Sequence, residues 1–234
     1  MEETSIQRPT VSTLTDEKRV AFYRKTYTHV ALAVLLFVLV EFIFFQMPGV
    51  LKFALSLTEG SMWLLMLGGF MLVTTYAEKM AMKSHDRNMQ YAALFIYVVA
   101  EAFIFIPMIF IAMFMAEEGG VEILNQAAIM TLAMFLGLSS VALLTKKDFS
   151  FLKSILTIGF FIALGLIVAG TIFGFNLGLW FSVGMIVLAS GSILYQTSNM
   201  VHKYEEDQYV AASLGLFAAL MLLFWYLLSI FSSD

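Results

Sequence analysis

Two glutamates stand inside long apolar stretches of this 234-residue chain, and their carboxyl groups are its strongest candidates for chemistry. They are Glu41 and Glu101; the other 15 of the 17 acidic residues lie in polar connections, at the ends of apolar stretches or in the termini. An ionisable group inside a bilayer is costly, and it marks an ion or proton site by default. A neutral carboxylic acid can instead donate a hydrogen bond between helices, so a structural role stays open for both residues.

The remaining polar side chains argue against a catalytic or metal site. The chain has no cysteine, which excludes thiolate chemistry and disulfides. His29, His85 and His202 lie at the end of an apolar stretch or in connections, without the spacing of metal ligands. Serine pairs such as Ser139 and Ser140 have no histidine base inside an apolar stretch, and no aspartate lies in one. We therefore expect no enzyme activity, no metal and no cofactor.

The composition is that of a membrane protein. Hydrophobic residues make up 61% of the chain and charged residues only 13%. A soluble domain is roughly half apolar and about a quarter charged. These values exclude a soluble globular enzyme and a disordered chain, and the net charge of -4 argues against a nucleic-acid partner. The chain is therefore expected to reside in a lipid bilayer.

Seven apolar blocks are each long enough to cross the membrane. At 1.5 Å per residue, about 20 residues span the hydrocarbon core, and backbone groups there must pair within a helix. The sequence thus predicts an all-α, polytopic bundle of seven transmembrane helices. The blocks cover approximately residues 29–47, 61–77, 91–115, 125–144, 151–173, 177–201 and 209–231.

The basic residues predict how this bundle is inserted. Twelve of the 13 Lys and Arg residues fall in the N-terminal segment and in every second connection, and Lys52 alone falls on the other side. The positive-inside rule places the basic side in the cytosol. The predicted division is a cytosolic tail over residues 1–27, a transmembrane domain over 28–231 and a short external tail over 232–234.

Tryptophans stand near the outer ends of three of these blocks. Trp63 and Trp180 lie near predicted outer ends, and Trp225 lies in the outer half of the last block. Tryptophan is enriched at membrane–water interfaces, where its ring anchors a helix. We therefore interpret all three as interfacial anchors.

A charged motif stands between the fourth and fifth blocks, where residues 145–152 read TKKDFSFL. Asp148 or Ser150 could cap the helix that follows, because their oxygens accept free backbone N–H groups. Lys146 and Lys147 would then serve only to orient the chain. This interpretation uses no function beyond folding and insertion.

The same motif resembles the Bax-inhibitor (transmembrane Bax inhibitor motif) family, in its bacterial YccA-like branch. Three further stretches are similar to that family: RKTY at 24–27, YA at 91–92 followed by Pro107, and SILYQTSN at 192–199 followed by 209–231. The resemblance runs from about residue 20 to residue 234. It implies a bundle with the last helix at its centre, in a bacterial cytoplasmic (inner) membrane. It also implies links to cation (calcium) leak, to pH sensing, to stress protection and to modulation of FtsH-type proteases.

The chain departs from the family at the pH sensor. The resemblance places the family's two aspartates at Gln196 and Ala219, and neither side chain can hold a titrating proton. The carboxylate pair therefore cannot be carried over to this chain. One hypothesis is that Glu101 supplies a relocated carboxylate within reach of Gln196.

Two functions remain. The first is regulation of membrane protein quality control or of a stress response, through an FtsH-type protease that binds the N-terminal tail. The alternative is a pH-influenced leak channel for calcium or protons that lacks the usual pair of aspartates.

Overall fold

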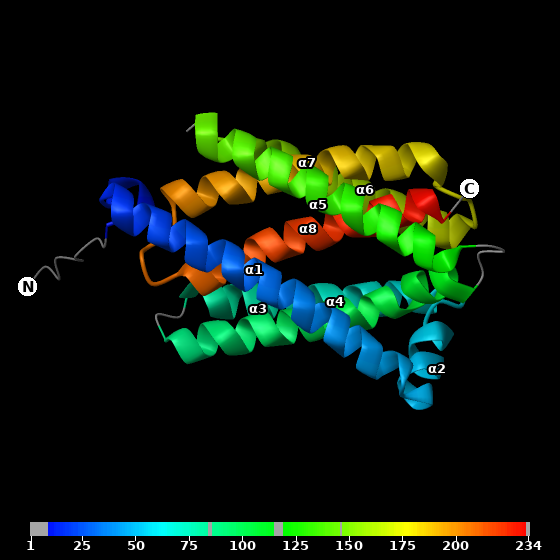
Figure 1. Cartoon of the computed structure of the whole chain (residues 1–234). Helices are drawn as coiled ribbons and strands as arrows, with labels where there is room; N and C mark the ends of the chain where they lie inside the picture. Colours follow the sequence, from blue (N-terminus) through cyan, green and yellow to red (C-terminus); the bar gives the residue numbers. More distant parts are fainter. Residues whose placement is uncertain (1–8, 84–85, 115–118, 146, 233–234) are drawn as a thin grey trace, which may run out of the picture.

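The computed structural model describes residues 9–83, 86–114, 119–145 and 147–232, and these residues form an all-α bundle (Figure 1). Six of its helices are long and apolar enough to cross a membrane. They are α1 (Asp16–Phe45), α4 (Arg87–Phe114), α5 (Gly120–Thr145), α6 (Leu152–Phe173), α7 (Gly178–His202) and α8 (Tyr209–Phe231). Each coincides with one of the predicted blocks to within a few residues, except that α1 begins earlier.

The one remaining predicted span, residues 61–77, corresponds to α3 (Met62–Lys83), which has 22 residues. It is not one of the six, because Thr74, Thr75, Tyr76, Glu78 and Lys79 make its last turns polar. The count of seven spans and the direction of insertion therefore stay predictions. A further helix, α2 (Pro48–Ser56), occupies the first connection, where the sequence predicted no element. Nine residues reach only about 14 Å, too short to cross a bilayer.

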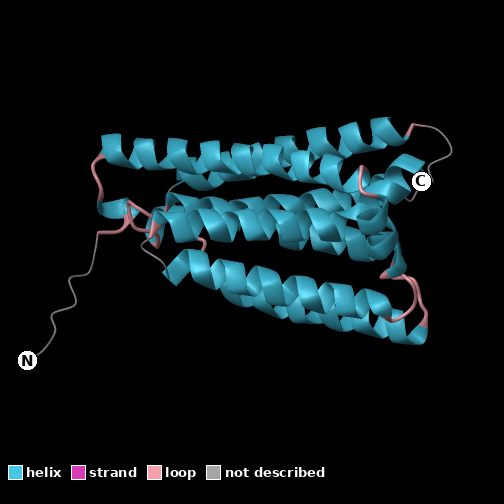
Figure 2. Cartoon of the chain, turned by 90° about the horizontal axis from the view of Figure 1, so that it is seen from below, coloured by secondary structure: helices cyan, strands magenta, loops and turns pink. Residues whose placement is uncertain are grey.

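Helix α8 lies at the centre of the bundle, as the family resemblance implied. It packs against α1, α3, α4, α5 and α7, and most of its residues between Tyr209 and Leu228 are buried. In Figure 1 it runs between the α3–α4 pair and the α5–α7 pair, and Figure 2 shows the same layers from a second direction. Helix α6 packs on α7 at the periphery.

Small residues in the first half of α8 make this central position feasible. Ala211, Ala212 and Ser213 are at most 2% exposed, so neighbouring helices approach the α8 backbone closely. A Cβ atom added at Gly215 would stand 3.0 Å from Oε1 of Gln196 on α7. Helices in lipid associate through such close contacts, because hydrocarbon tails provide no hydrophobic driving force between them.

The segment before α1 is folded against the rest of the protein. The Val11 N–H donates a hydrogen bond to the Tyr204 carbonyl at 2.9 Å, and Thr10 forms an isolated bridge with Glu205. Helix α1 then begins at Asp16, where acidic residues in the first turn favour a helix N-terminus. The predicted cytosolic tail (1–27) is therefore helical from Asp16 onward, and its place in the cytosol stays a prediction. Residues 1–8 and 233–234 of the predicted tails lie outside the described residues.

The bundle has two ends with different character. We name the N-terminal end for the start of α1 and the C-terminal end for the finish of α8 (Figure 1). Helices α1, α4, α6 and α8 run from the first end to the second, and α5 and α7 return.

The buried face of α8 can be tested with two Phe→Ala variants. Phe217 on α8 is fully buried, whereas Phe161 on α6 is 64% exposed. Truncating a buried Phe in a protein core costs about 3–5 kcal/mol, because contacts are lost and a cavity remains. We expect Phe217→Ala to lower the melting temperature in detergent by several degrees and Phe161→Ala to leave it nearly unchanged. Equal effects would contradict the central position of α8.

Candidate functional site

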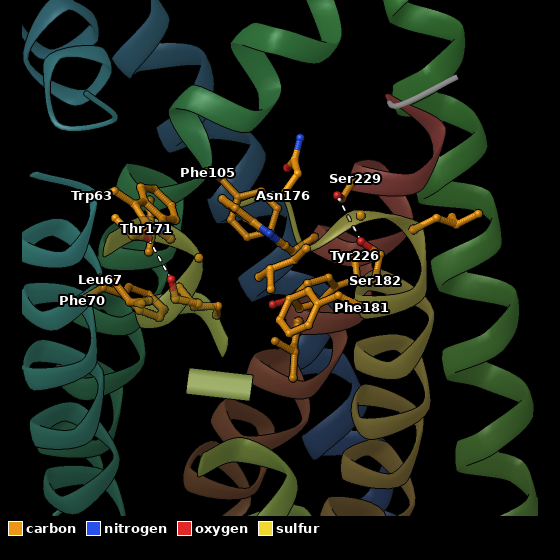
Figure 3. A pocket seen from close by; sticks show the side chains of 18 of the residues that line it. Trp63, Leu67, Phe70, Phe105, Thr171, Asn176, Phe181, Ser182, Tyr226 and Ser229 are labelled. Atoms are coloured by element: carbon orange, nitrogen blue, oxygen red, sulfur yellow. Dashed lines mark hydrogen bonds between the residues drawn. The ribbon is translucent and has the colours of Figure 1, made fainter. Parts of the chain in front are cut away.

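A cavity of about 620 Å³ opens among α3, α4, α6, α7 and α8 in the C-terminal half of the bundle. Its walls come from the start of α3, the end of α6, the start of α7 and the end of α8, which all meet at that end. Figure 3 shows Trp63 and Phe105 on one side of the cavity and Ser182, Tyr226 and Ser229 on the other. Most of its lining side chains are apolar or aromatic, with a few polar groups among them, and a space of this size is large enough for several water molecules.

Glu101 lies at the floor of this cavity. Of the α4 residues that line it, Glu101 is the farthest from the C-terminal end, and it is 5% exposed. Its Oε2 atom is buried and has no hydrogen-bond partner among the described residues. Phe70 and Leu222 hold the equivalent deepest positions on α3 and α8. The sequence placed this carboxyl group near mid-membrane, and the structure places it where a cavity ends.

Aromatic rings form much of the wall above Glu101. Trp63 and Trp225 stack with centroids 6.1 Å apart, and Phe105 meets Trp225 edge to face at 4.9 Å. Trp63 and Trp225 thus line the cavity and pack against the core, and their role as interfacial anchors stays a prediction. Trp180 is 85% exposed at the start of α7 and points away from the bundle.

Hydroxyl groups add polarity nearer the mouth of the cavity. Ser182 on α7 and Ser229 on α8 lie 3.5 Å apart between their Oγ atoms (Figure 3). The Thr171 hydroxyl donates to the Ile167 carbonyl at 2.8 Å. The mouth is thus polar, the middle is aromatic and the floor is acidic.

The floor is closed on its inner side by a second aromatic contact. Tyr97, one turn before Glu101, meets Phe217 of α8 edge to face at 6.2 Å. Glu78 of α3 lies near enough to interact electrostatically with Glu101, Tyr97 and Tyr204. Glu78 is exposed, and the sequence counted it only as an acid at the end of a block. Tyr97 and Glu101 are four residues apart, and this spacing in the sequence could have indicated that they lie on the same face of α4.

The other intramembrane acid, Glu41, lies outside this cavity. It is 6% exposed on α1, and neither of its carboxylate oxygens has a hydrogen-bond partner among the described residues. Its neighbours one turn away on α1, Phe37 and Phe44, pack on Phe105 and Phe103 of α4. Glu41 is thus a buried acid in an aromatic interface.

The structure does not bring Glu101 and Gln196 together. Gln196 packs against Gly215 of α8, whereas Glu101 is level with Leu222. Seven residues along a helix correspond to about 10 Å. No hydrogen bond among the described residues joins the two side chains, so Glu101 is not a direct replacement for a carboxylate beside Gln196. Ala219 is buried on α8, one turn from Gly215.

The TKKDFSFL motif connects α5 and α6 to the end of α7. Oδ1 of Asp148 accepts the Ser150 backbone N–H at 2.8 Å, and Oγ of Ser198 accepts the Phe149 N–H at 2.9 Å. The expected capping of α6 by Asp148 or Ser150 is wrong, because Phe151 is the capping residue and no side chain bonds the free N–H groups. Lys147 is exposed. Lys146 lies outside the described residues.

Comparison with known proteins adds a family. Residues 19–234 match the family described as "Inhibitor of apoptosis-promoting Bax1". An uncharacterized protein of Pseudomonas aeruginosa is 38% identical over 120 residues, which cover 51% of this chain and 54% of that protein. Protein lifeguard 4 of Mus musculus is 28% identical over 217 residues, covering 90% and 84%. The Golgi anti-apoptotic protein of Vaccinia virus is 31% identical over 115 residues, covering 47% of each. The matched region thus spans about half of the length of the Pseudomonas aeruginosa and Vaccinia virus relatives.

The TKKDFSFL motif (145–152) predicts a small effect of pH on the stability of the folded protein. Hydrogen bonds from Ser150 hold the pKa of Asp148 below its ordinary value. The ionised carboxylate therefore stabilises the folded state above the ordinary pKa of aspartate, and this contribution disappears as the pH falls through the lowered pKa. We expect Asp148→Asn to melt slightly below wild type at pH 7, and the effect is small because the carboxylate is exposed. The two proteins should melt alike once the pH is low enough to protonate Asp148 in the folded state.

A second variant separates charge from geometry at the motif. Ser198→Ala removes the acceptor of the Phe149 N–H, which does not titrate, and a long hydrogen bond of 3.4 Å to Oδ1 of Asp148. Its melting temperature should fall both at pH 7 and at low pH, and somewhat more at pH 7, where Asp148 is ionised. A pH-independent defect in Asp148→Asn would contradict the role of the carboxylate charge.

Proposed function

This chain belongs to the family of inhibitors of apoptosis-promoting Bax1, and on that premise we propose that it is a cation leak pathway whose conducting path begins in the cavity above Glu101. The observation that carries this proposal is the unpartnered Oε2 atom of Glu101 at the cavity floor. A buried carboxylate without a partner is costly, and a cation that reaches it offsets that cost.

The cavity supplies the features that an ion entrance needs. Ser182 and Ser229 near the mouth can replace part of the hydration shell of a cation with hydroxyl oxygens. The rings of Trp63 and Trp225 present π-faces and edges around the space between mouth and floor. A cation entering from the C-terminal end would therefore meet hydroxyl groups, then rings, then a carboxyl group.

The closed inner side of the floor fits a gate. Tyr97 and Phe217 separate Glu101 from the N-terminal half of the bundle, and apolar constrictions of this kind stop ions by excluding water. Glu78 provides a second carboxyl group beyond that contact. We infer that conduction requires Tyr97 and Phe217 to separate, and that the path then continues toward Glu78.

The direction and the membrane follow from the charge distribution. With the basic end in the cytosol, the cavity opens to the outside of the cell. In a bacterial cytoplasmic membrane the pathway would admit calcium or protons from outside. Because Gln196 and Ala219 cannot titrate, any pH response would depend on acids other than the usual pair of aspartates.

Flux through reconstituted protein tests the role of Glu101. We expect Glu101→Gln to reduce calcium entry into proteoliposomes about tenfold, which corresponds to losing about 1.4 kcal/mol of interaction with the ion. Glu41→Gln is the matched control, since it neutralises a buried acid that does not line the cavity. The proposal fails if wild type conducts no better than empty liposomes, or if both variants reduce flux equally.

A second function, regulation of an FtsH-type membrane protease in a stress response, is favoured by the folded N-terminal segment. Residues 9–15 are held on the α7–α8 connection through Val11, which is fully buried, and Leu14, which is 9% exposed. Lys18 adds an ion pair to Glu206 at 3.0 Å. This segment and the connection together form a defined surface for a partner. The viral relative is named for an anti-apoptotic role, which fits a function in stress.

Two deletions test this second function. Removing residues 1–15 eliminates the docked segment, whereas removing residues 1–8 retains it. We expect the longer deletion to abolish co-purification with the protease and the shorter one to preserve it, with calcium flux unchanged in both. Continued co-purification of the longer deletion would count against a binding role for this segment.

A further inference from the structure

We propose that the N-terminal end of the bundle holds a second binding site, specific for a phosphate group, formed by Lys25, Arg87 and Tyr209. The three residues come from α1, α4 and α8, far apart in the sequence. The site lies at the opposite end of the bundle from the cavity, so it is independent of the proposed ion pathway.

The geometry of the site centres on the ring of Tyr209. The Lys25 Nζ atom lies 5.3 Å from the ring centroid, and the Arg87 Cζ atom lies 5.5 Å from it. The ring itself is only 6% exposed, while both cationic side chains are exposed. Two positive groups within 5.5 Å of one ring centroid lie at most about 11 Å apart, and because both are long, exposed side chains they can converge on the oxygens of a single phosphate.

His29 and Tyr91 fix the surroundings of this ring. The His29 ring lies 5.0 Å from the Tyr209 ring and 5.6 Å from the Tyr91 ring. Its Nδ1 donates to the Lys25 carbonyl at 2.7 Å, because a carbonyl can only accept. In the neutral ring, Nε2 then accepts the Tyr91 hydroxyl at 2.9 Å. The residues around Tyr209 are therefore ordered before a ligand arrives.

The positive charge of this cluster is not balanced by the carboxylates around it. Lys18 pairs with Glu206 and Arg19 with Asp16, but among the described residues no ion pair joins Lys25 or Arg87 to an acid. The neighbouring Asp86 accepts the Asn88 N–H at 2.9 Å. Other basic side chains at this end also have no ion pair among the described residues, and Lys25 and Arg87 differ from them in lying over the same ring.

The backbone adds to the same preference. Arg87 is the first residue of α4 and Tyr209 is the first residue of α8. The N-terminus of a helix carries partial positive charge, which favours an anion. At α4 the Asp86 carboxylate already accepts one of these N–H groups, whereas the capping residue of α8, Gln208, makes no side-chain cap hydrogen bond. A phosphate between Lys25 and Arg87 would offset the side-chain repulsion and the helix dipole of α8.

The location selects the ligand class. The site stands at the start of α4 and α8, beside the part of α1 where its long apolar stretch follows Lys25. We place it at the depth at which phospholipid headgroups surround a membrane protein. A phosphate diester on an anionic lipid has the required charge and oxygens, with its acyl chains beside α1 and α4. Free inorganic phosphate offers the same chemistry, so the experiment must distinguish the two sources.

Lipid binding to the full-length protein in detergent tests the proposal. Native mass spectrometry would compare phosphatidylglycerol with phosphatidylcholine for wild type, Lys25→Gln/Arg87→Gln and the control Lys147→Gln/Lys153→Gln. The control removes the same charge at the same end of the bundle. We expect about a tenfold preference for phosphatidylglycerol in wild type and control, and its loss in the Lys25/Arg87 pair. No preference in wild type, or equal losses in both pairs, would overturn the site.

Two further measurements complete the design. The exchange Lys25→Arg/Arg87→Lys keeps both charges and should retain most of the preference; its loss there would overturn a site built on charge. Thermal stabilisation by inorganic phosphate that requires Lys25 and Arg87 would identify free phosphate as the source, and stabilisation by phosphatidylglycerol alone would identify the lipid. Stabilisation by neither would overturn the proposal. Glu101→Gln should leave lipid binding unchanged, which separates this site from the ion pathway.

Discussion

Close packing around α8 is the constraint on which the rest of the structure depends. Lipid tails are as apolar as leucine side chains, so burial alone cannot hold helices together in a bilayer. Helix α8 meets this constraint because its sequence is uncharged and its first half contains small residues such as Ala211, Ala212 and Gly215. These small residues let neighbouring helices approach the α8 backbone. Five other helices pack directly on it. A bulky or charged residue in this half would separate the α3–α4 pair from the α5–α7 pair.

The same helix explains where the cavity forms. After Ala219, α8 changes from small residues to a run that includes Phe224, Trp225 and Tyr226. The cavity begins at Leu222, and Trp225 and Tyr226 of this run line it. Glu101 lines the same floor, and its carboxyl group is buried there.

The two ends of the bundle have opposite electrostatic character. Toward the C-terminal end, the cavity is lined by the acidic side chain of Glu101, where we propose that cations enter. At the N-terminal end, Lys25 and Arg87 lie over the buried ring of Tyr209, where we propose that an anion binds. Both features use α4 and α8, and Tyr97 and Phe217 lie between them.

The sequence by itself determined the elements and the candidates, and the tertiary structure decided which candidates meet. Apolar block lengths predicted six of the long helices closely, and Glu41 and Glu101 were both expected to be buried acids, as they are. Hydropathy is a property of one segment, so it could not reveal that Trp63 and Trp225 line a cavity or that Lys25 and Arg87 share one ring. Nor could it reveal that Gln196 packs at Gly215 of α8 whereas Glu101 lines the cavity together with Leu222. Those facts depend on which faces of crossing helices come into contact. That contact is set by the side-chain volumes of all the neighbours together, which no single segment contains.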